Sequence, residues 1–557
     1  MVPHCILRQG CPSCYPPSSS GRRSPTDDLR SVNQTVSGSR PPASFAGRPK
    51  SAETPKNNRQ SNTRTGGWHS RPASAYGPAA NRSNLRCRRP AATIPSMQHD
   101  APAVTPRRTF FGHVNVVMAT YLVDGALAFA SGVLVARALG PGGRGAYALF
   151  VVSTAFGQML LGLGFGNAAV YFLNKRELPL RQIVSALHVV VGLSAIVTAL
   201  AVAAVVPWAG AGVLGEGLPA WLLIAAVPAL IWSSALTVTL QAQSRFAEMG
   251  VALVAQPALM LALVAVTYAV GHPTPALVVW FWVASNVGSG AVAVWRIGLA
   301  NFDFARIVRP RWAVLRTMAG FGIKGEAGNA LQLMNYRLDQ YVVKAFVSIA
   351  GVGYYAVGVS LAEAVWLIPN SVALVLLPRL TAASDDEVRW MTPVAARNTI
   401  LVAAAGSAVL AVAAPIVVPA LFGHAYDKSV RALWWLLPGT VALAGSKVLT
   451  SYIFSQGRPF VNTMITMASL VVTVGALFVL VPAYGVSGAA AASSLAYGAH
   501  LCAALYAYRR ISGQSPVEAL LPRPSDLHLY TDALRGALAR VTGRPQLETG
   551  GAPRAGG

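Results

Sequence analysis

Long apolar stretches separated by short polar segments follow one another through most of this chain. A helix needs about 20 predominantly apolar residues to cross the hydrocarbon core of a membrane. Twelve stretches reach that length: 113–138, 145–173, 182–207, 219–243, 248–270, 275–297, 316–347, 352–382, 393–421, 430–455, 460–481 and 485–508. The pattern predicts an all-α integral membrane protein with twelve transmembrane helices.

The composition agrees with a protein that lies largely in lipid. The chain has 557 residues, of which 54% are hydrophobic and only 12% are charged, whereas soluble domains carry about 25% charged residues. The net charge of +25 would indicate nucleic-acid binding on a compact soluble domain. Here the charge is spread over a tail and short loops, so we expect contacts with membrane lipids and no nucleic-acid partner.

Basic residues in the connecting segments favour one side of the predicted membrane. With a cytoplasmic N-terminus, the inner segments hold Lys175, Arg176, Arg181, Arg245, the five arginines from Arg296 through Arg316, Arg379, Arg389, Arg397, Arg458, Arg509 and Arg510. The outer segments hold only Arg144, Lys428 and Arg431. Because basic loops stay on the cytoplasmic side, this bias predicts a multi-pass plasma-membrane protein with both termini in the cytoplasm.

The two ends of the chain lack such apolar stretches. Residues 1–108 are rich in Ser, Pro and Arg, so they bury too little apolar surface to fold, and we predict a disordered basic tail. In an alternative interpretation, translation starts at Met97.

Cys11 and Cys14 have the spacing of half a zinc site, but no second pair follows, and neither a metal nor a cofactor is expected. Residues 511–557 are predicted to form a cytoplasmic C-terminal tail.

Two similar stretches indicate an internal repeat. VARALGPGGRGAYALF (135–150) aligns with VKAFVSIAGVGYYAVG (343–358) when one gap of one residue is allowed. The alignment places Arg137 on Lys344 before the gap and Gly145 on Gly353 after it. A second pair, QSRF at the end of the fourth span and QGRPF at the end of the tenth, has nearly the same offset. Spans one to six and seven to twelve are therefore predicted to be copies of each other.

The repeat predicts two six-helix lobes, residues 109–300 and 301–510, related by a pseudo-twofold axis along the membrane normal. A substrate site is then expected between the lobes near the middle of the membrane. In each copy, the stretch between the first two helices (GPGGRG or SIAGVG) is predicted to be a tight external hairpin, in which glycine supplies the positive φ angles of the turn.

The seventh predicted span is the least lipid-like, and charge within a membrane helix normally faces a partner or a wet cavity. At about 100° per residue, one face of this helix gathers Glu326, Asn329, Arg337, Gln340 and Lys344. The opposite face gathers Lys324, Asn335 and Asp339. We expect one face to line an aqueous cavity and the other to pair with neighbouring helices.

Polar residues in the other spans are fewer: Asp124, Arg137 and Glu363, with weaker support for Lys447, His188 and His500. Cations between two lobes suit an anionic substrate, because Arg and Lys bind phosphate oxygens through charge-assisted hydrogen bonds. Simpler interpretations stay open. Arg137 and Lys344 lie near helix ends, from which long side chains reach the membrane interface, and Arg337 with Asp339 could form a structural pair.

Six segments carry a resemblance to a known family. They are LVARALGPGGRGAYALF (134–150), RLDQYVVKAFVSIAGVGYYAVG (337–358), VALVLLPRLTA (372–382), LFGHAYDKSVRALWWLLPG (421–439), SQGRPF (455–460) and PAYGVSGAAAASSLAYG (482–498). With these segments the chain resembles the polysaccharide biosynthesis proteins, which are flippases for lipid-linked oligosaccharides. Their wider superfamily also includes multidrug extrusion transporters and lipid II flippases.

The resemblance implies alternating access between the two lobes. It also implies a central cationic cavity for the diphosphate and sugars of an undecaprenyl-linked substrate. On this basis the expected headgroup contacts are Arg337, Lys344, Arg137 and Lys324. The candidates for ion coupling or for structural pairs are Asp124, Glu326, Asp339 and Glu363.

We therefore expect an alternating-access flippase for cell-surface polysaccharide biosynthesis, whose partners are the lipid-linked oligosaccharide, membrane lipids and the glycosyltransferases and polymerase of the same pathway. One alternative is a proton- or sodium-coupled multidrug exporter, although the first lobe offers it only Asp124 as an acidic group. The other is a membrane glycosyltransferase or polymerase. Outer loops of only about 5–12 residues leave such an enzyme little room for catalytic groups, so no catalytic residue is expected.

Overall fold

The computed structural model describes residues 107–210, 218–271, 273–298, 312–521, 523 and 526. Within these residues the chain is helical and contains no strand. The predicted N-terminal tail 1–108 lies outside them except for its last two residues, and so do Cys11 and Cys14. The predicted C-terminal tail 511–557 is described mainly over its first residues.

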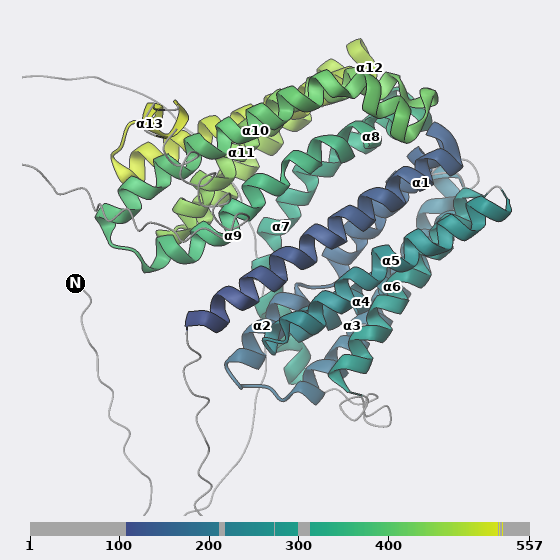
Figure 1. The fold of residues 1–557 in the computed structure, drawn as a ribbon. Coiled ribbons are helices and arrows are strands. Elements are labelled where there is room, and N and C mark those ends of the chain that lie inside the picture. The colour runs from purple at the N-terminus through teal and green to yellow at the C-terminus, as the bar shows by residue number, and fades with distance from the viewer. Residues whose placement is uncertain are drawn as a thin grey trace, which may run out of the picture. The chain divides into compact units, whose positions relative to one another are not determined.

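The helices follow one another through short connections (Figure 1). In chain order they are α1 Arg107–Leu161, α2 Phe165–Asn174, α3 Leu180–Ala209, α4 Leu223–Ala242, α5 Phe246–Val270, α6 Pro275–Ile297, α7 Trp312–Phe346, α8 Ile349–Val365, α9 Leu367–Ala382, α10 Asp385–Phe422, α11 Lys428–Ser455, α12 Pro459–Ser512 and α13 Pro516–Leu520. Two short 3-10 helices, η1 Ala220–Leu222 and η3 His424–Tyr426, precede α4 and α11.

The two longest helices each contain a break at a glycine. In α1 the dihedral angles of Gly140 are non-helical (φ 65°, ψ 179°), and in α12 those of Gly485 are non-helical (φ 59°, ψ −133°). Only glycine adopts such positive φ angles without a steric cost. The two segments of α12 fold against each other, since the Ser469 hydroxyl donates to the carbonyl oxygen of Ala496 at 2.8 Å. Each of these helices is therefore a pair of spans joined by a one-glycine turn.

The predicted spans are present in the structure. Among the described residues, eight helices are long and apolar enough to cross a membrane, and a ninth is added if α8 and α9, bent by 44°, form one span. The eight include α1 and α12, each of which supplies two segments. They do not include α7, because charged and amide residues interrupt its apolar sequence. With α7 included and α1 and α12 divided, the helices follow the twelve predicted stretches in order.

The turns of α1 and α12 lie at the same end of the molecule, because Gly485 is adjacent to Val347, just beyond the last residue of α7. We call this end the hairpin end. The opposite end, where α1 begins and α12 ends, is called the terminal end.

The glycines of the two predicted hairpins have a different role from the one expected. Of the glycines in those two stretches only Gly140 has a positive φ, and the turns are shorter than predicted. Gly145 and Gly353 lie inside helices, where the backbones of α1 and α8 touch. A Cβ atom on Gly145 would overlap the carbonyl oxygen of Ile349, and one on Gly353 would overlap that of Pro141. These two glycines permit a close approach of backbones rather than a turn.

The helices form two groups, α1–α6 and α8–α12, with α7 between them (Figure 1). Each group contains an apolar core, and α7 contributes to both. The core of the second group also contains Ala136, Ala148 and Leu149 of α1. Leu315 and Met318, near the start of α7, pack into the core of the first group. Val342 and Val343, near its end, pack into the core of the second group. α7 therefore connects the two groups along its whole length.

After α12, a short C-terminal segment returns to the terminal end of the second group. Its helix α13 packs against α10, and Asp526 accepts two hydrogen bonds from Arg397 of α10, both 2.5 Å long. The side chains of Arg397 and Asp526 are only 6% and 5% exposed, so this is a buried ion pair. The hydrogen bonds from Arg397 hold the pKa of the Asp526 carboxyl below its ordinary range.

Loss of this ion pair is expected to release the C-terminal segment. Breaking a buried ion pair costs about 3–5 kcal/mol, so Asp526→Asn should raise the hydrogen exchange rate of residues 516–521 at least about tenfold at pH 7. Because the folded-state pKa is lowered, the stabilisation is fully present above the ordinary pKa of about 3.9. It is lost as the pH falls through the lowered value, so wild-type protection should persist at pH 5.

Arg523→Gln is the matched control for this prediction. Arg523 pairs with Glu518 at 3.5 Å through side chains that are 53% and 42% exposed, and exposed pairs contribute little. Equal exchange rates in wild type and Asp526→Asn would show that the ion pair does not hold the segment.

Candidate functional site

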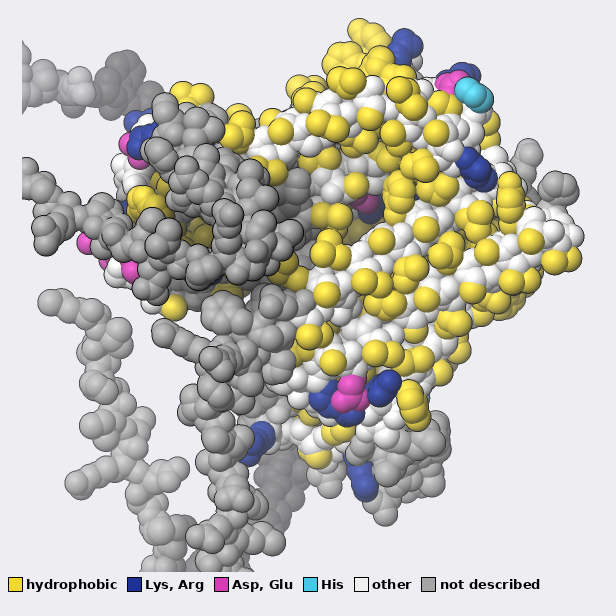
Figure 2. All heavy atoms as spheres, in the orientation of Figure 1, with side chains coloured by type: hydrophobic (Ala, Val, Ile, Leu, Met, Phe, Trp, Pro, Cys, Tyr) yellow, Lys and Arg dark blue, Asp and Glu magenta, His cyan; other side chains and the backbone are white. Residues whose placement is uncertain are grey.

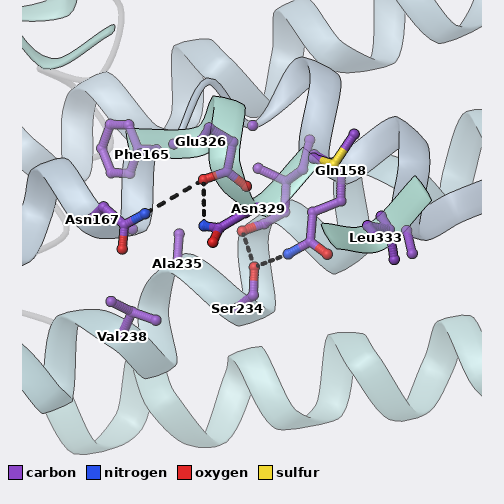
Figure 3. A pocket seen from close by; sticks show the side chains of 15 residues that line it. Gln158, Phe165, Asn167, Ser234, Ala235, Val238, Glu326, Asn329 and Leu333 are labelled. Carbon is purple, nitrogen blue, oxygen red and sulfur yellow. Dashed lines mark hydrogen bonds between the residues drawn. The ribbon is translucent and has the colours of Figure 1, made fainter. Parts of the chain in front are cut away.

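A polar cavity of about 370 Å³ lies where the second segment of α1, α2, α4 and the first half of α7 meet (Figure 3). Its polar lining residues are Gln158, Asn167, Ser234, Glu326 and Asn329, and we call it the amide cavity. Phe165, Ile231, Ala235 and Leu333 contribute apolar wall. Gly164 and Gly322 touch through their backbones, which brings the start of α2 against α7 and places Asn167 opposite Glu326.

Hydrogen bonds in the amide cavity join α2 to α7 and α1 to α4. The amide groups of Asn167 and Asn329 donate to Glu326 Oε2 at 3.4 and 3.3 Å. On the other side, Gln158 Nε2 donates to Ser234 Oγ at 2.7 Å. None of the described residues that line the cavity is a lysine or an arginine. The amide cavity therefore presents neutral amides, a hydroxyl and one carboxylate.

A second polar region lies farther along α7, facing α8 and α11. Arg337 Nη2 is 2.9 Å from Glu363 Oε1, and the two side chains are 27% and 29% exposed. Lys447 of α11 donates to Asn370 Oδ1 at 2.7 Å and lies 4.7 Å from the centre of the Trp366 ring. We call Arg337, Glu363, Asn370 and Lys447 the cation cluster.

Aromatic rings stand beside the cation cluster. The ring centre of Tyr336 is 5.1 Å from that of Trp366 and 5.9 Å from that of Tyr497, and the last two are 6.0 Å apart. The two contacts of Tyr497 are edge-to-face, at 84° and 69°, and the contact of Tyr336 with Trp366 is tilted at 41°, so the three rings form one aromatic group. Together with the guanidinium of Arg337 and the ammonium of Lys447, they offer stacking surfaces next to positive charge.

The remaining charged residue of this part of α7 is buried in the second group. Asp339 is 2% exposed and accepts hydrogen bonds from Tyr355 Oη at 2.5 Å and Ser493 Oγ at 3.2 Å. One turn earlier, Asn335 bonds to Ser469 of α12. Asn335 and Asp339 therefore pair with neighbouring helices, whereas Lys324, predicted on the same face, is exposed and bonds to no described residue. Arg337 pairs with Glu363 and not with Asp339.

The other predicted cations differ in their surroundings. Arg137, at the hairpin end, donates to the carbonyl oxygens of Leu421 at 2.6 Å and Ala420 at 2.5 Å, in the last turn of α10. Lys324 is exposed and Lys344 is half-buried, and neither has an ion pair or hydrogen bond to a described residue. Arg137 thus binds a helix C-terminus, where a cation is favoured, while the two lysines are open to a ligand.

The predicted acidic groups are also separated from one another. Glu326 lies in the amide cavity, Glu363 in the cation cluster and Asp339 in the core of the second group. Asp124 is half-buried in the first segment of α1 and bonds to no described residue. No three His, Cys, Asp or Glu side chains in the described part of the chain converge on a possible metal position.

Reasoning from the sequence missed the residues that α1, α2 and α4 contribute to the amide cavity. Gln158, Asn167 and Ser234 each stand alone in an apolar stretch, where one uncharged polar residue is a weak signal. Lys447 received only weak support although it belongs to the cation cluster. Nothing in the sequence shows that it meets Asn370 and Trp366.

The surface supports a location in lipid. Figure 2 shows mostly hydrophobic side chains over the described part of the face in view. Basic and acidic side chains lie toward the ends of the helices and, in one small patch, inside the hollow between the groups. A polar interior inside an apolar exterior is the arrangement expected of a protein that moves a polar group through a membrane.

Comparison with known proteins agrees with this architecture. Residues 134–431, more than half of the chain, match a family model described as polysaccharide biosynthesis protein. No curated protein matches the sequence.

Solved transporter structures have the same fold. The lipid II flippase MurJ in an inward closed conformation aligns with a TM-score of 0.57 and 12% identity, over 78% of this chain and 94% of MurJ. An inward-facing multidrug resistance MATE family transporter of the MOP superfamily gives 0.57 and 16%, over 70% and 94%. A MOP superfamily transporter from Pyrococcus furiosus gives 0.52 and 13%, over 72% and 94%.

At such identities the structural likeness concerns the fold alone, and that fold is shared by a flippase and by multidrug transporters. The family match covers the hairpin of α1, all of α7 and α8, and the start of α11. With its apolar spans and its MurJ- and MATE-like transporter fold, this chain is a multi-pass membrane protein that belongs to the polysaccharide biosynthesis protein family.

Proposed function

We propose that this protein is a flippase that moves a lipid-linked oligosaccharide across the cytoplasmic membrane, with the headgroup passing between the two groups of helices and the polyprenyl tail remaining in the bilayer. The observation that carries the proposal is the cation cluster in the membrane interior, with Arg337 and Lys447 beside aromatic rings. A diphosphate is the anionic part of such a headgroup, and arginine binds phosphate oxygens in a bidentate manner.

Arg337 is the central phosphate ligand in this proposal. Its pair with Glu363 stabilises the guanidinium in the membrane interior while no substrate is bound. A diphosphate oxygen would replace the carboxylate as the partner of Arg337. Lys344, which bonds to no described residue, lies about 10 Å farther along α7 toward the hairpin end, at 1.5 Å per residue. Lys344 would bind the diphosphate after Arg337 releases it during translocation.

The orientation is also part of the proposal. Lys175, Arg176, Arg245 and Arg458 lie in connections at the terminal end. Because basic connections favour the cytoplasmic side, the terminal end is assigned to the cytoplasm and the hairpin end to the outer face. Lys324, near the terminal end of α7, would then meet the headgroup as it enters from the cytoplasm.

Contacts at the hairpin end support a conformation that is closed toward the outside. Gly145 and Gly353 bring α1 and α8 into backbone contact. Arg137 binds the last turn of α10, and Tyr426 donates to the carbonyl oxygen of Ala136 at 2.9 Å. Substrate would therefore load from the terminal end, and these contacts would separate for release.

A multidrug exporter is the second candidate function, and the observation that favours it is the lone carboxylate of Glu326 in a cavity without cations. An enzyme of the same pathway has no comparable support, since the structural neighbours are transporters.

The two candidate functions are distinguished by transport in reconstituted vesicles. Wild-type protein should translocate a fluorescent undecaprenyl-diphosphate oligosaccharide, measured by the fraction that becomes accessible to a membrane-impermeant quencher. Protein-free vesicles set the background rate. Proton-driven efflux of a cationic dye, without lipid translocation by the same folded protein, would contradict the proposal and favour the exporter.

A further inference from the structure

The chemistry of the amide cavity differs from that of the cation cluster on the same helix. Its polar groups are the amides of Gln158, Asn167 and Asn329, the hydroxyl of Ser234 and the carboxylate of Glu326. A phosphate group would meet a carboxylate there and no cation, so the amide cavity repels the anionic part of the headgroup. It needs a neutral ligand that both donates and accepts hydrogen bonds.

The hydrogen-bonding groups of the cavity are only partly used. A carboxylate has room for about four hydrogen bonds, yet the two that Glu326 accepts both go to Oε2, at 3.3 and 3.4 Å. Glu326 Oε1 has no donor among the described residues. The carbonyl oxygens of Asn167 and Asn329 also accept no hydrogen bond from the described residues. A hydroxyl group donates one hydrogen bond and accepts two, and several hydroxyl groups on one ring would satisfy these atoms together.

The walls and size also fit such a ligand. Val238 and Leu333 line the cavity and are half-buried, so they supply an apolar wall for the C–H face of a pyranose ring. A volume of about 370 Å³ falls within the range of small-molecule sites, about 300–1,000 Å³.

We propose that the amide cavity binds sugar rings of the substrate headgroup and that the cation cluster binds its diphosphate. This division of labour rests on the proposed function and deepens it. Glu326 precedes Arg337 by 11 residues in α7, which is about 16 Å along the helix at 1.5 Å per residue. α7 thus separates a neutral sugar site near the terminal end from an anion site deeper in the membrane. When a headgroup loads from the cytoplasm, its diphosphate reaches the cation cluster and its sugars occupy the amide cavity, which is nearer the terminal end.

The test compares a diphosphate lipid without sugar with lipids that carry the oligosaccharide. One is undecaprenyl diphosphate. The other is the pool of lipid-linked oligosaccharides extracted from cells of the source organism in which the gene for this chain is deleted. Binding to wild-type protein in nanodiscs should be at least about tenfold tighter for the oligosaccharide lipid, because several hydrogen bonds are added. Equal affinities for the two lipids would overturn the sugar site and leave the flippase proposal standing. Binding of neither lipid would overturn the flippase proposal itself.

A substitution in the cavity has a matched control elsewhere in the first group. Gln158→Ala should weaken binding of the oligosaccharide lipid about tenfold and leave undecaprenyl diphosphate unaffected. Gln256 bonds to Ser285 at 3.1 Å much as Gln158 bonds to Ser234, but it does not line the cavity. Gln256→Ala should therefore bind both lipids as wild type does. An equal loss for both lipids in Gln158→Ala would indicate damage to the fold and contradict a sugar contact.

Glu326→Gln separates a sugar contact from an ion site. The amide replaces an acceptor oxygen by a donor and removes the charge, so the oligosaccharide lipid should bind several-fold more weakly. If the cavity holds a proton or Na⁺ instead, the variant would bind the oligosaccharide lipid as tightly as wild type, while its transport would lose its dependence on pH or Na⁺. That result would overturn the sugar assignment.

Discussion

Arg337→Glu is expected to reduce translocation of the lipid-linked oligosaccharide at least about 100-fold, to the level of protein-free vesicles. The substitution removes a charge-assisted phosphate contact, typically about 1.5–3 kcal/mol. It also places a second carboxylate beside Glu363, which lies 2.9 Å from the present guanidinium. The anionic headgroup would then meet two acidic groups where it now meets a cation. The measurement is headgroup translocation in vesicles, with reconstitution checked by the amount of inserted protein.

Neutral variants of the two partners distinguish a substrate contact from a purely structural ion pair. If Arg337 binds phosphate and Glu363 is its resting partner, Arg337→Gln should weaken substrate binding about tenfold or more. Glu363→Gln should bind substrate as tightly as wild type or more tightly, because it removes a competing carboxylate. An ion pair that only holds α7 to α8 predicts similar losses in both variants. Equal losses would therefore contradict the role of Arg337 as a phosphate ligand.

Much of the fold could be predicted from the pattern of apolar residues alone. A transmembrane helix must be both long and apolar, so each span leaves a strong signal, and the helices follow the predicted stretches in order. α7 shows where the signal is weaker. Its polar residues predict that it contacts other polar groups. The sequence does not show which helices supply those groups, because that depends on how the helices pack. Met318 near its start and Val343 near its end pack into different cores.

The candidate site was less accessible to sequence reasoning. Charged residues in spans stand out, so Arg337, Glu363 and Glu326 were found individually. Their partners were not found, because the contacts join positions far apart in the chain. Arg337 pairs with Glu363 rather than with its neighbour Asp339, whose carboxylate is instead bound by Tyr355 and Ser493. Gln158 and Asn167 are single amides in apolar stretches, and only the folded arrangement shows that they share a cavity with Glu326.

Gly145→Ala is expected to keep the hairpin end from closing and to lower transport at least about tenfold. The new Cβ atom would overlap the carbonyl oxygen of Ile349. Carbon and carbonyl oxygen atoms in contact are about 3.3 Å apart, so α1 and α8 must move apart by roughly 1 Å or more. The neighbouring contacts of Arg137 with α10 and of Tyr426 with Ala136 depend on the same approach and would weaken as well.

Spin labels measure this separation directly. Trp208 is 93% exposed in the last turn of α3, and the side chain of His424 is 89% exposed in η3. The two residues lie in different groups of helices. Labels at these two positions in a cysteine-free protein should give a longer mean distance in Gly145→Ala than in wild type, together with the loss of transport.

Gly142→Ala is the control, because Gly142 lies three residues before Gly145 in the same helix but a Cβ atom there meets nothing within 4 Å. Both substitutions raise helix propensity by a similar amount, up to about 1 kcal/mol, so propensity cannot explain a difference between them. Gly142→Ala should keep the wild-type distance and the wild-type rate. If Gly145→Ala also kept both, the contact between α1 and α8 would not be what closes the hairpin end. If Gly142→Ala also lost transport, the loss would come from reduced flexibility near the break at Gly140 and not from the contact between α1 and α8. A loss confined to Gly145→Ala would show that closure of the hairpin end depends on the backbone contact at Gly145 and Gly353.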